Sequence, residues 1–265
     1  MQAYWQKQGT EPLFPDLLWS RPENRQHAGK LLIIGGHAHG FAAPAEAFSA
    51  AEKAGIGTAR VLLPDHIRPQ LAKFQGAGLE TEFAPSTPSG SFASKALAEL
   101  LDASNWADGV LLAGDLGRNS ETAIVLEKFA AKTKLPLIIS KDAVDYFTSS
   151  PDVLLPRGNA CIVLSIAQLQ KLAVQAKFIT AITFGMDLMR LVEALHDFTS
   201  QYDIHLITKH QDSLIVASSG QVSSTKTSLD VEDSWRVATA AAASVWWIQN
   251  QSKTFEALTT ALHKN

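Results

Sequence analysis

Two glycine turns, each directly after a short apolar run, constrain the fold of this chain more than any other feature. The run Lys30–Ile34 ends at Gly35-Gly36, and the run Gly109–Ala113 ends at Gly114. In parallel sheets such turns bring backbone N–H groups up to a phosphate. One turn of this kind is weakly specific, but two in one chain favour a nucleotide-handling α/β protein.

The composition is that of a single globular domain with no nucleic-acid surface. The chain has 265 residues, of which 46% are hydrophobic and 18% charged, and its net charge is −3. Lys and Arg are scattered, so neither nucleic acid nor an anionic membrane is an expected partner. Cys161 is the only cysteine, and we expect a small buried hydrophobe there rather than a nucleophile. With no apolar leader and no run of membrane-spanning length, the sequence predicts a soluble cytoplasmic protein.

After residue 29 the chain alternates predicted strands with predicted helices, which indicates βαβ units and a mostly parallel sheet. We therefore expect two parts, an extended arm over residues 1–29 and a single domain over residues 30–265. The predicted strands are Lys30–Ile34, Thr58–Leu63, Gly109–Ala113, Leu135–Ser140, Ile204–Thr208 and Leu214–Ser218. The predicted helices are Pro44–Ala54, Ser94–Ser104, 120–133, Ile166–Gln175, Asp187–Tyr202, Asp233–Gln249 and Thr254–Leu262.

Tryptophan is concentrated near the two ends of the chain. The arm carries Trp5 and Trp19 among several prolines, and the long helix near the C-terminus carries Trp235, Trp246 and Trp247. Exposing so much aromatic area would be costly. We expect the arm to dock on the body or on a neighbouring subunit, and the helix tryptophans to be buried in an oligomer interface or under the arm. A homo-oligomer is therefore predicted.

Four segments, in a consistent order and spacing, resemble the motifs of the ADP/ATP-dependent NAD(P)H-hydrate dehydratases. They are Gly35-Gly36 with Ala43-Pro44, similar to GGS…GAP; 113–119 (AGDLGRN), similar to GPGLGR; 138–144 (IISKDAV), similar to DADAL; and 206–209 (LITK) with the hairpin 214–220, similar to VLKG…TVI…G. The resemblance covers most of the chain after residue 29. It implies a ribokinase-like three-layer α/β sandwich, with a central, mostly parallel sheet and helices on both faces.

The same resemblance implies a reaction and a set of site residues. Such enzymes repair hydrated NADH or NADPH: a phosphoryl group from ADP or ATP, with Mg²⁺, turns the hydroxyl of the hydrated ring into a leaving group. The reaction needs a carboxylate base and an anion hole. The substrate-binding residues it implies are Gly36, His37, Ala43, Gly117, Asp142 and Arg157, and the nucleotide-binding residues are Gly114, Lys209 and His210.

The strongest departure from the family lies at its GSGD motif. Here the sequence reads Asp230-Val231-Glu232-Asp233, so Asp233 matches the catalytic aspartate while both glycines are replaced by acids. Glycine is needed where the backbone approaches a phosphate closely, and two carboxylates there would repel a polyphosphate. The alternative for Asp233 is a helix N-cap or a first-turn acid.

Further departures fall in the other motifs. Asp115 replaces the proline of GPGLG, His210 replaces a glycine, and Arg157 replaces the histidine of the family's TPHxGE block. For Asp142 two roles stay open, holding Mg²⁺ through water or capping the following turn. His37 and His39 have no further ligands at compatible spacing, so no metal site is predicted.

Three hypotheses follow from these motifs and departures. The first is a dehydratase that repairs hydrated NADH or NADPH with substituted residues. The second is a catalytically silent homologue that binds a nucleotide or dinucleotide or serves as a structural subunit. The third, a small-molecule kinase of the same fold, is weaker, because such kinases also depend on the glycine-rich anion hole.

Overall fold

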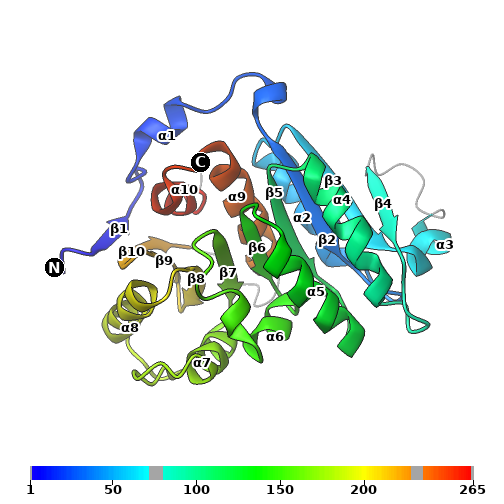
Figure 1. The fold of residues 1–265 in the computed structure, drawn as a ribbon. Coiled ribbons are helices and arrows are strands. Elements are labelled where there is room, and N and C mark those ends of the chain that lie inside the picture. The colour runs from blue at the N-terminus through cyan, green and yellow to red at the C-terminus, as the bar shows by residue number, and fades with distance from the viewer. Residues whose placement is uncertain (1, 72–79, 228–234, 264–265) are drawn as a thin grey trace.

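One mixed sheet runs through the molecule and contains all the strands among the described residues (Figure 1). The fold is described from a computed structural model, which covers residues 2–71, 80–227 and 235–263. Within these residues the strand order is β1-β10-β9-β8-β7-β6-β5-β2-β3-β4. The strands are β1 (Trp5–Gln8), β2 (Lys30–Gly35), β3 (Thr58–Pro64), β4 (Thr81–Ala84), β5 (Gly109–Gly114), β6 (Leu137–Ser140), β7 (Ala160–Leu164), β8 (His205–His210), β9 (Ser213–Ser218) and β10 (Gln221–Lys226).

The sheet is parallel except at β9, which runs antiparallel to both β8 and β10. The other neighbouring pairs, from β1 with β10 to β3 with β4, are parallel. The carboxyl ends of β2, β5, β6, β7 and β8 therefore meet at one edge of the sheet. This edge is where an open α/β sheet places its ligand site.

Helices cover both faces of the sheet (Figure 1). One face packs against α4 (Leu97–Trp106), α5 (Ser120–Lys132), α6 (Ala143–Thr148), α7 (Ile166–Gln175) and α8 (Leu188–Gln201). The other packs against α2 (Ala42–Lys53), α9 (Trp235–Gln249) and α10 (Thr254–Thr260). The short helices α1 (Pro15–Trp19) and α3 (Arg68–Leu71) and four 3₁₀ turns at 25–27, 65–67, 94–96 and 151–153 complete the described elements. The predicted three-layer α/β sandwich is confirmed.

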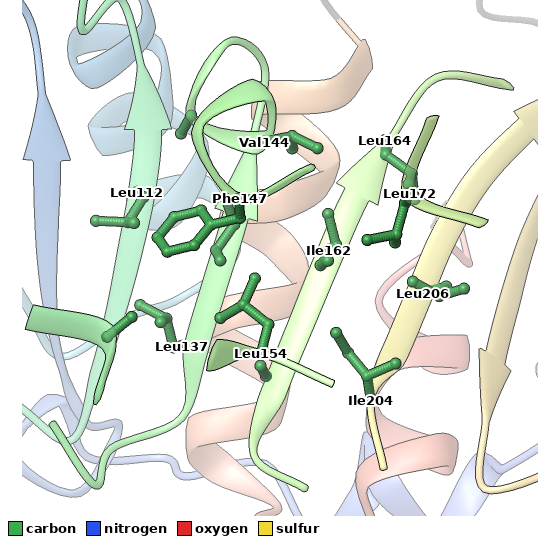
Figure 2. Close-up of a cluster of buried hydrophobic side chains, with 14 of the residues drawn as sticks. Leu112, Leu137, Val144, Phe147, Leu154, Ile162, Leu164, Leu172, Ile204 and Leu206 are labelled. Atoms are coloured by element: carbon green, nitrogen blue, oxygen red, sulfur yellow. The ribbon is translucent and has the colours of Figure 1, made fainter. Parts of the chain in front are cut away.

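The central strands are buried on both faces, which explains why they read as continuous apolar runs. In β2, Leu32 and Ile34 point into the core on the α4–α8 side, whereas Leu31 and Ile33 point into the core on the α2 and α9 side. Figure 2 shows part of the core on the α4–α8 side, where Phe147 of α6 lies over Leu112 and Leu137. Strands buried on both faces lose the alternation of apolar and polar residues.

The N-terminal arm joins the sheet of its own chain through β1, which pairs in parallel with β10. Trp5 Nε1 donates to Ser224 Oγ at 3.0 Å, and Gln8 Nε2 donates to the Thr259 carbonyl at 2.9 Å. Further along the arm, Leu17 packs against Trp246 of α9. Trp246 is thus buried under the arm, one of the two predicted alternatives, while Trp235 and Trp247 are buried within the same chain.

Candidate functional site

Three loops meet at the carboxyl edge of the sheet, where β2, β5 and β6 end. The Gly36 N–H donates to the Gly114 carbonyl at 3.0 Å, which joins the turn after β2 to the end of β5. Gly114 has φ +111°, and a Cβ at this position would lie 2.6 Å from Asp142 Oδ1. Only glycine fits there, because Asp142 approaches the backbone from the loop after β6.

Asp142 holds the loop after β5 by accepting two of its backbone N–H groups. Its Oδ1 accepts from Asp115 N at 2.7 Å, and its Oδ2 accepts from Leu116 N at 2.9 Å. Asp142 is the N-cap residue of α6, yet its side chain caps no N–H of that helix. Its contacts therefore point across to the neighbouring loop, and its observed role is to position residues 114–117.

The carboxylate of Asp115 lies at the N-terminus of α2. Its Oδ2 accepts the Ala43 N–H at 2.7 Å, and its Oδ1 pairs with Lys141 Nζ at 2.5 Å. The side chain is only 15% exposed. Asp115 and Lys141 have φ values of +57° and +55°, a conformation uncommon for residues other than glycine. The Ala43 N–H, a predicted substrate contact, is thus already bonded within the chain.

His37 and Tyr146 place two rings beside this loop. His37 Nδ1 lies 2.8 Å from the Asp115 carbonyl oxygen, and because a carbonyl only accepts, Nδ1 carries the hydrogen of this contact. The Tyr146 hydroxyl donates to the Gly117 carbonyl at 2.5 Å. Burial raises the pKa of Tyr146, so the hydroxyl stays protonated near neutral pH.

A cavity of about 700 Å³ opens between these loops. Its size lies within the usual range for small-molecule and cofactor sites. Cations, a carboxamide and two rings share its wall with carboxylates. The lining residues are His37, Asp115, Gly117, Arg118, Asn119, Ser120, Ala123, Asp142, Asp145, Tyr146, Thr148, Ser149 and Lys171. No group of three His, Cys, Asp or Glu side chains suited to a metal occurs among the residues that the structure covers.

Gln168 of α7 links this cavity to the start of α9. Its Nε2 donates to the Lys141 carbonyl at 2.8 Å and to Asp145 Oδ1 at 3.2 Å, and its Oε1 accepts from Arg236 Nη1 at 3.1 Å. Arg236 follows the segment that carries Asp233. Asp233 itself, with residues 230–232, lies outside the described residues, so its predicted catalytic role stays a prediction.

Lys209 and His210 end β8, further along the same edge. Two strands, β7 and β6, separate β8 from β5, which at a strand spacing of about 4.8 Å places these residues about 14 Å from Gly114. His210 is 8% exposed. Among the described residues its Nε2, like the hydroxyl of Thr208 two residues earlier, is buried without a hydrogen-bond partner. Buried polar atoms without partners are uncommon, and such atoms suit contact with a ligand or water.

The structure does not bring Arg157, a predicted substrate-binding residue, together with the other predicted residues. The chain crosses to the amino edge of the sheet between α6 and β7, and Arg157 lies there, before β7 begins. Its guanidinium donates to the carbonyls of Ala130, in the last turn of α5, and Leu135. Burial lowers the pKa of Arg157. It stabilises the end of α5 and does not share an edge with Asp142.

Five of the nine predicted binding residues therefore lie close together, in or beside the loops that follow β2 and β5. They are Gly36, His37, Ala43, Gly114 and Gly117. Sequence reasoning missed Arg118, Tyr146, Lys171 and Gln168. Tyr146 lies four residues after Asp142, one helical turn on, and this spacing was the available signal for it. Lys171 and Gln168 reach the site from α7, and nothing local in the sequence marks them.

Comparisons with known proteins show what the fold is similar to. No family model and no curated protein matches the chain. A ribokinase-like superfamily protein from Enterococcus faecalis is 15% identical with a TM-score of 0.73, over 99% of this chain and 86% of that one. A hypothetical protein from Streptococcus mutans is 16% identical with a TM-score of 0.70, over 94% and 87%.

A third similar structure is the ADP/ATP-dependent NAD(P)H-hydrate dehydratase from Bacillus subtilis, co-crystallised with ATP and Mg²⁺. It is 11% identical with a TM-score of 0.69, over 95% of this chain and 86% of that one. At these identities the likeness concerns the fold. The predicted ribokinase-like architecture is confirmed, and the structural neighbours include NAD(P)H-hydrate dehydratase.

Proposed function

We propose that the protein is NAD(P)H-hydrate dehydratase-like and binds NADH, NADPH or the hydrate of either in the cavity at the ends of β2, β5 and β6. The observation that carries the proposal is the chemistry of this wall. Arg118 and Lys171 offer positive charge, Asn119 offers an amide, and His37 and Tyr146 offer rings. A dinucleotide presents the complementary groups, namely phosphates, hydroxyls and planar bases.

We propose that ADP or ATP, with Mg²⁺, contacts the carboxyl end of β8 and the start of α9. The buried Nε2 of His210, which lacks a hydrogen-bond partner among the described residues, supports a polar ligand there. Lys209 precedes His210 in the chain, and Arg236 carries positive charge at the start of α9, where it donates to Gln168. The nucleotide would supply the phosphoryl group that makes the hydroxyl of the hydrated ring a leaving group, and Asp233 is the candidate base.

A silent homologue, which binds the dinucleotide without turnover, is the second candidate. It is favoured by Asp230 and Glu232, which stand where the family has the glycines of its anion hole. The two candidates agree on dinucleotide binding and differ only in the reaction.

The test is a thermal-shift screen followed by a turnover assay. NADH, NADPH, NAD⁺, AMP, ADP and ATP are compared with and without Mg²⁺. A ligand at about 100 times its Kd adds about 2.7 kcal/mol of stability. We expect NADH or NADPH to raise the Tm. Recovery of NADH from its hydrate, dependent on ADP or ATP and abolished by Asp233→Asn, would establish the dehydratase. Binding without recovery would establish the silent homologue, and no shift with any dinucleotide would overturn the proposal.

A further inference from the structure

We propose that two copies of this chain form a two-fold symmetric dimer through the α7–α8 loop (residues 176–187) and the helix turns on either side of it. The tryptophans of α9, on which the predicted homo-oligomer depended, are buried within their own chain, so an oligomer needs a different surface. None of the residues that carry this inference lines the cavity, so it does not depend on the proposed function. The exposed apolar side chains of the surface are Val174, Ile179, Phe184 and Met189.

The α7–α8 loop is irregular, but inward-facing side chains fix it to the body of the protein. Every fourth residue, namely Phe178, Ile182 and Met186, packs against the core on the α4–α8 side. The Phe178 ring meets the Phe198 ring of α8 edge to face, with 5.1 Å between the ring centroids. The side chains between these anchors therefore point outward, and they cannot enter the core unless the anchors leave it.

The outward side chains expose enough apolar surface for a stable interface. The four apolar residues are each 61% to 96% exposed, and together they present roughly 500 Å² of apolar surface, a size at which a surface patch is often functional. Each partner of a stable complex buries about 800 Å², of which somewhat more than half is apolar. The patch thus supplies about the apolar area that one side of a dimer needs. Among the described residues, the other large exposed apolar side chains, Trp19 and Ile124, lie on α1 and α5.

The charges of the α7–α8 loop complement those of a second copy. Residues 178–186 contain no charged side chain, whereas Lys177 precedes them and Asp187 follows them. A two-fold axis pairs the loop with its copy in opposite directions, which brings Lys177 of each copy to Asp187 of the other. An anionic membrane would instead favour cations at both ends of the apolar segment. The surface therefore suits a second copy of this chain.

Asp187 remains accessible to a second copy despite its contacts within the chain. Its Oδ1 accepts the Arg190 N–H at 2.9 Å and so caps α8, and its Oδ2 lies 3.8 Å from Arg190 Nε. Both side chains of this ion pair are mostly exposed. Exposed pairs of this kind contribute little to stability, so the Asp187 carboxylate can also accept Lys177 of a second copy.

Sedimentation velocity of the full chain over a range of protein concentrations measures the dimer directly. We expect a reversible monomer–dimer equilibrium in the parent. The double variant Ile179→Ser, Phe184→Ser should raise the Kd of the dimer at least about tenfold, because it removes the centre of the apolar patch. Both side chains are exposed in the single chain, so the Tm should not fall. Trp19→Ser, which removes an equally exposed side chain from α1, is the matched control and should leave the Kd unchanged.

Charge reversal tests the two-fold geometry. Lys177→Glu alone and Asp187→Lys alone each place two pairs of like charges in the dimer and should weaken it. An equal mixture of these two variants should dimerise again, because each introduced charge then meets the opposite charge on the other copy. Asp187→Asn keeps an oxygen to cap α8, and it should weaken the dimer in the same direction if Asp187→Lys does not fold.

Three results would overturn the inference. The first is a parent that stays monomeric at every concentration, and binding of neutral phosphatidylcholine vesicles by that monomer would assign the surface to a membrane instead. The second is a dimer that is as tight in the Ile179→Ser, Phe184→Ser variant as in the parent. The third is a mixture of the two charge-reversal variants that dimerises no better than either variant alone.

Discussion

At the scale of single residues, Asp142 is the side chain that organises the site. Its two oxygens accept the N–H groups of Asp115 and Leu116. Hydrogen bonds to a charged acceptor contribute about 1.5–3 kcal/mol each, and a buried N–H left unpaired adds a penalty. Asp142→Ala should therefore lower the free energy of unfolding by about 3 kcal/mol, with Asp142→Asn in between because it retains one oxygen.

Urea unfolding monitored by circular dichroism measures this effect. Asp152→Ala, which removes an exposed carboxylate from a 3₁₀ turn, is the matched control and should change little. A loss in Asp142→Ala no larger than that in the control would contradict the role assigned to Asp142.

His205, which the site does not use, predicts a pH dependence. Its Nε2 donates to the Gly158 carbonyl at 3.0 Å, and its Nδ1 accepts from the Ser218 hydroxyl at 2.8 Å, so the neutral ring satisfies both contacts. Burial lowers the pKa of His205 in the folded protein, while the adjacent Gly158 and Asp203 oppose this change. As the pH drops below 6.5, His205 therefore binds a proton more readily in the unfolded chain than in the folded protein. The free energy of unfolding consequently decreases as the pH falls.

Comparing the free energy of unfolding at pH 7.5 and pH 5 for the parent and His205→Asn measures the contribution of His205 protonation to stability. The parent should lose more stability than the variant over this interval, whereas the exposed His39→Asn should follow the parent. An equal loss in the parent and His205→Asn would show that His205 does not titrate in this way.

At the scale of elements, the sequence predicts most of the α/β alternation but misses the strands β1, β4, β7 and β10. The predicted helix Ile166–Gln175, capped by Ser165, is observed with these bounds. By contrast, β10 has no apolar pattern, because its buried Ser223, Ser224 and Thr225 are satisfied by Thr259, Trp5 and Gln8. These partners lie more than 30 residues away, so no local pattern could reveal the strand.

The pairing of β1 with β10 carries its own prediction. Trp5 is 9% exposed and bonds to Ser224, whereas Trp19, in the same arm, is 88% exposed. Truncating a buried aromatic to alanine costs about 3–5 kcal/mol, so Trp5→Ala should destabilise the protein by about that amount. Trp19→Ala should stay within about 0.5 kcal/mol of the parent. Equal effects of the two substitutions in urea unfolding would show that the arm does not dock through β1.

At the scale of the whole molecule, topology explains which site residues could be predicted. Gly114 ends its strand, and Gly36 and Asp142 follow theirs; because these strands run in the same direction, a parallel sheet brings the three residues to one edge. Arg157 precedes a strand, and the same rule places it at the opposite edge. The position of the Asp115 carboxylate depends on two positive φ values and a contact with α2, which only the assembled fold specifies.

The packing of helices on both faces of the sheet also explains how Gln168 of α7 connects the cavity to the start of α9. Gln168 contacts Asp145, which belongs to a helix on one face of the sheet, and Arg236, which belongs to a helix on the other face.

None of the described helices is long and apolar enough to cross a membrane.

The central claim, that the cavity binds a dinucleotide through Arg118 and Lys171, is tested most directly by titrating NADPH by calorimetry. The account predicts saturable binding at one site, weakened about tenfold by Lys171→Ala, that is, by about 1.4 kcal/mol. Lys128→Ala, an exposed lysine of α5 that does not line the cavity, should leave the Kd unchanged. Absence of saturable binding, or equal affinity in Lys171→Ala and the parent, would contradict the account.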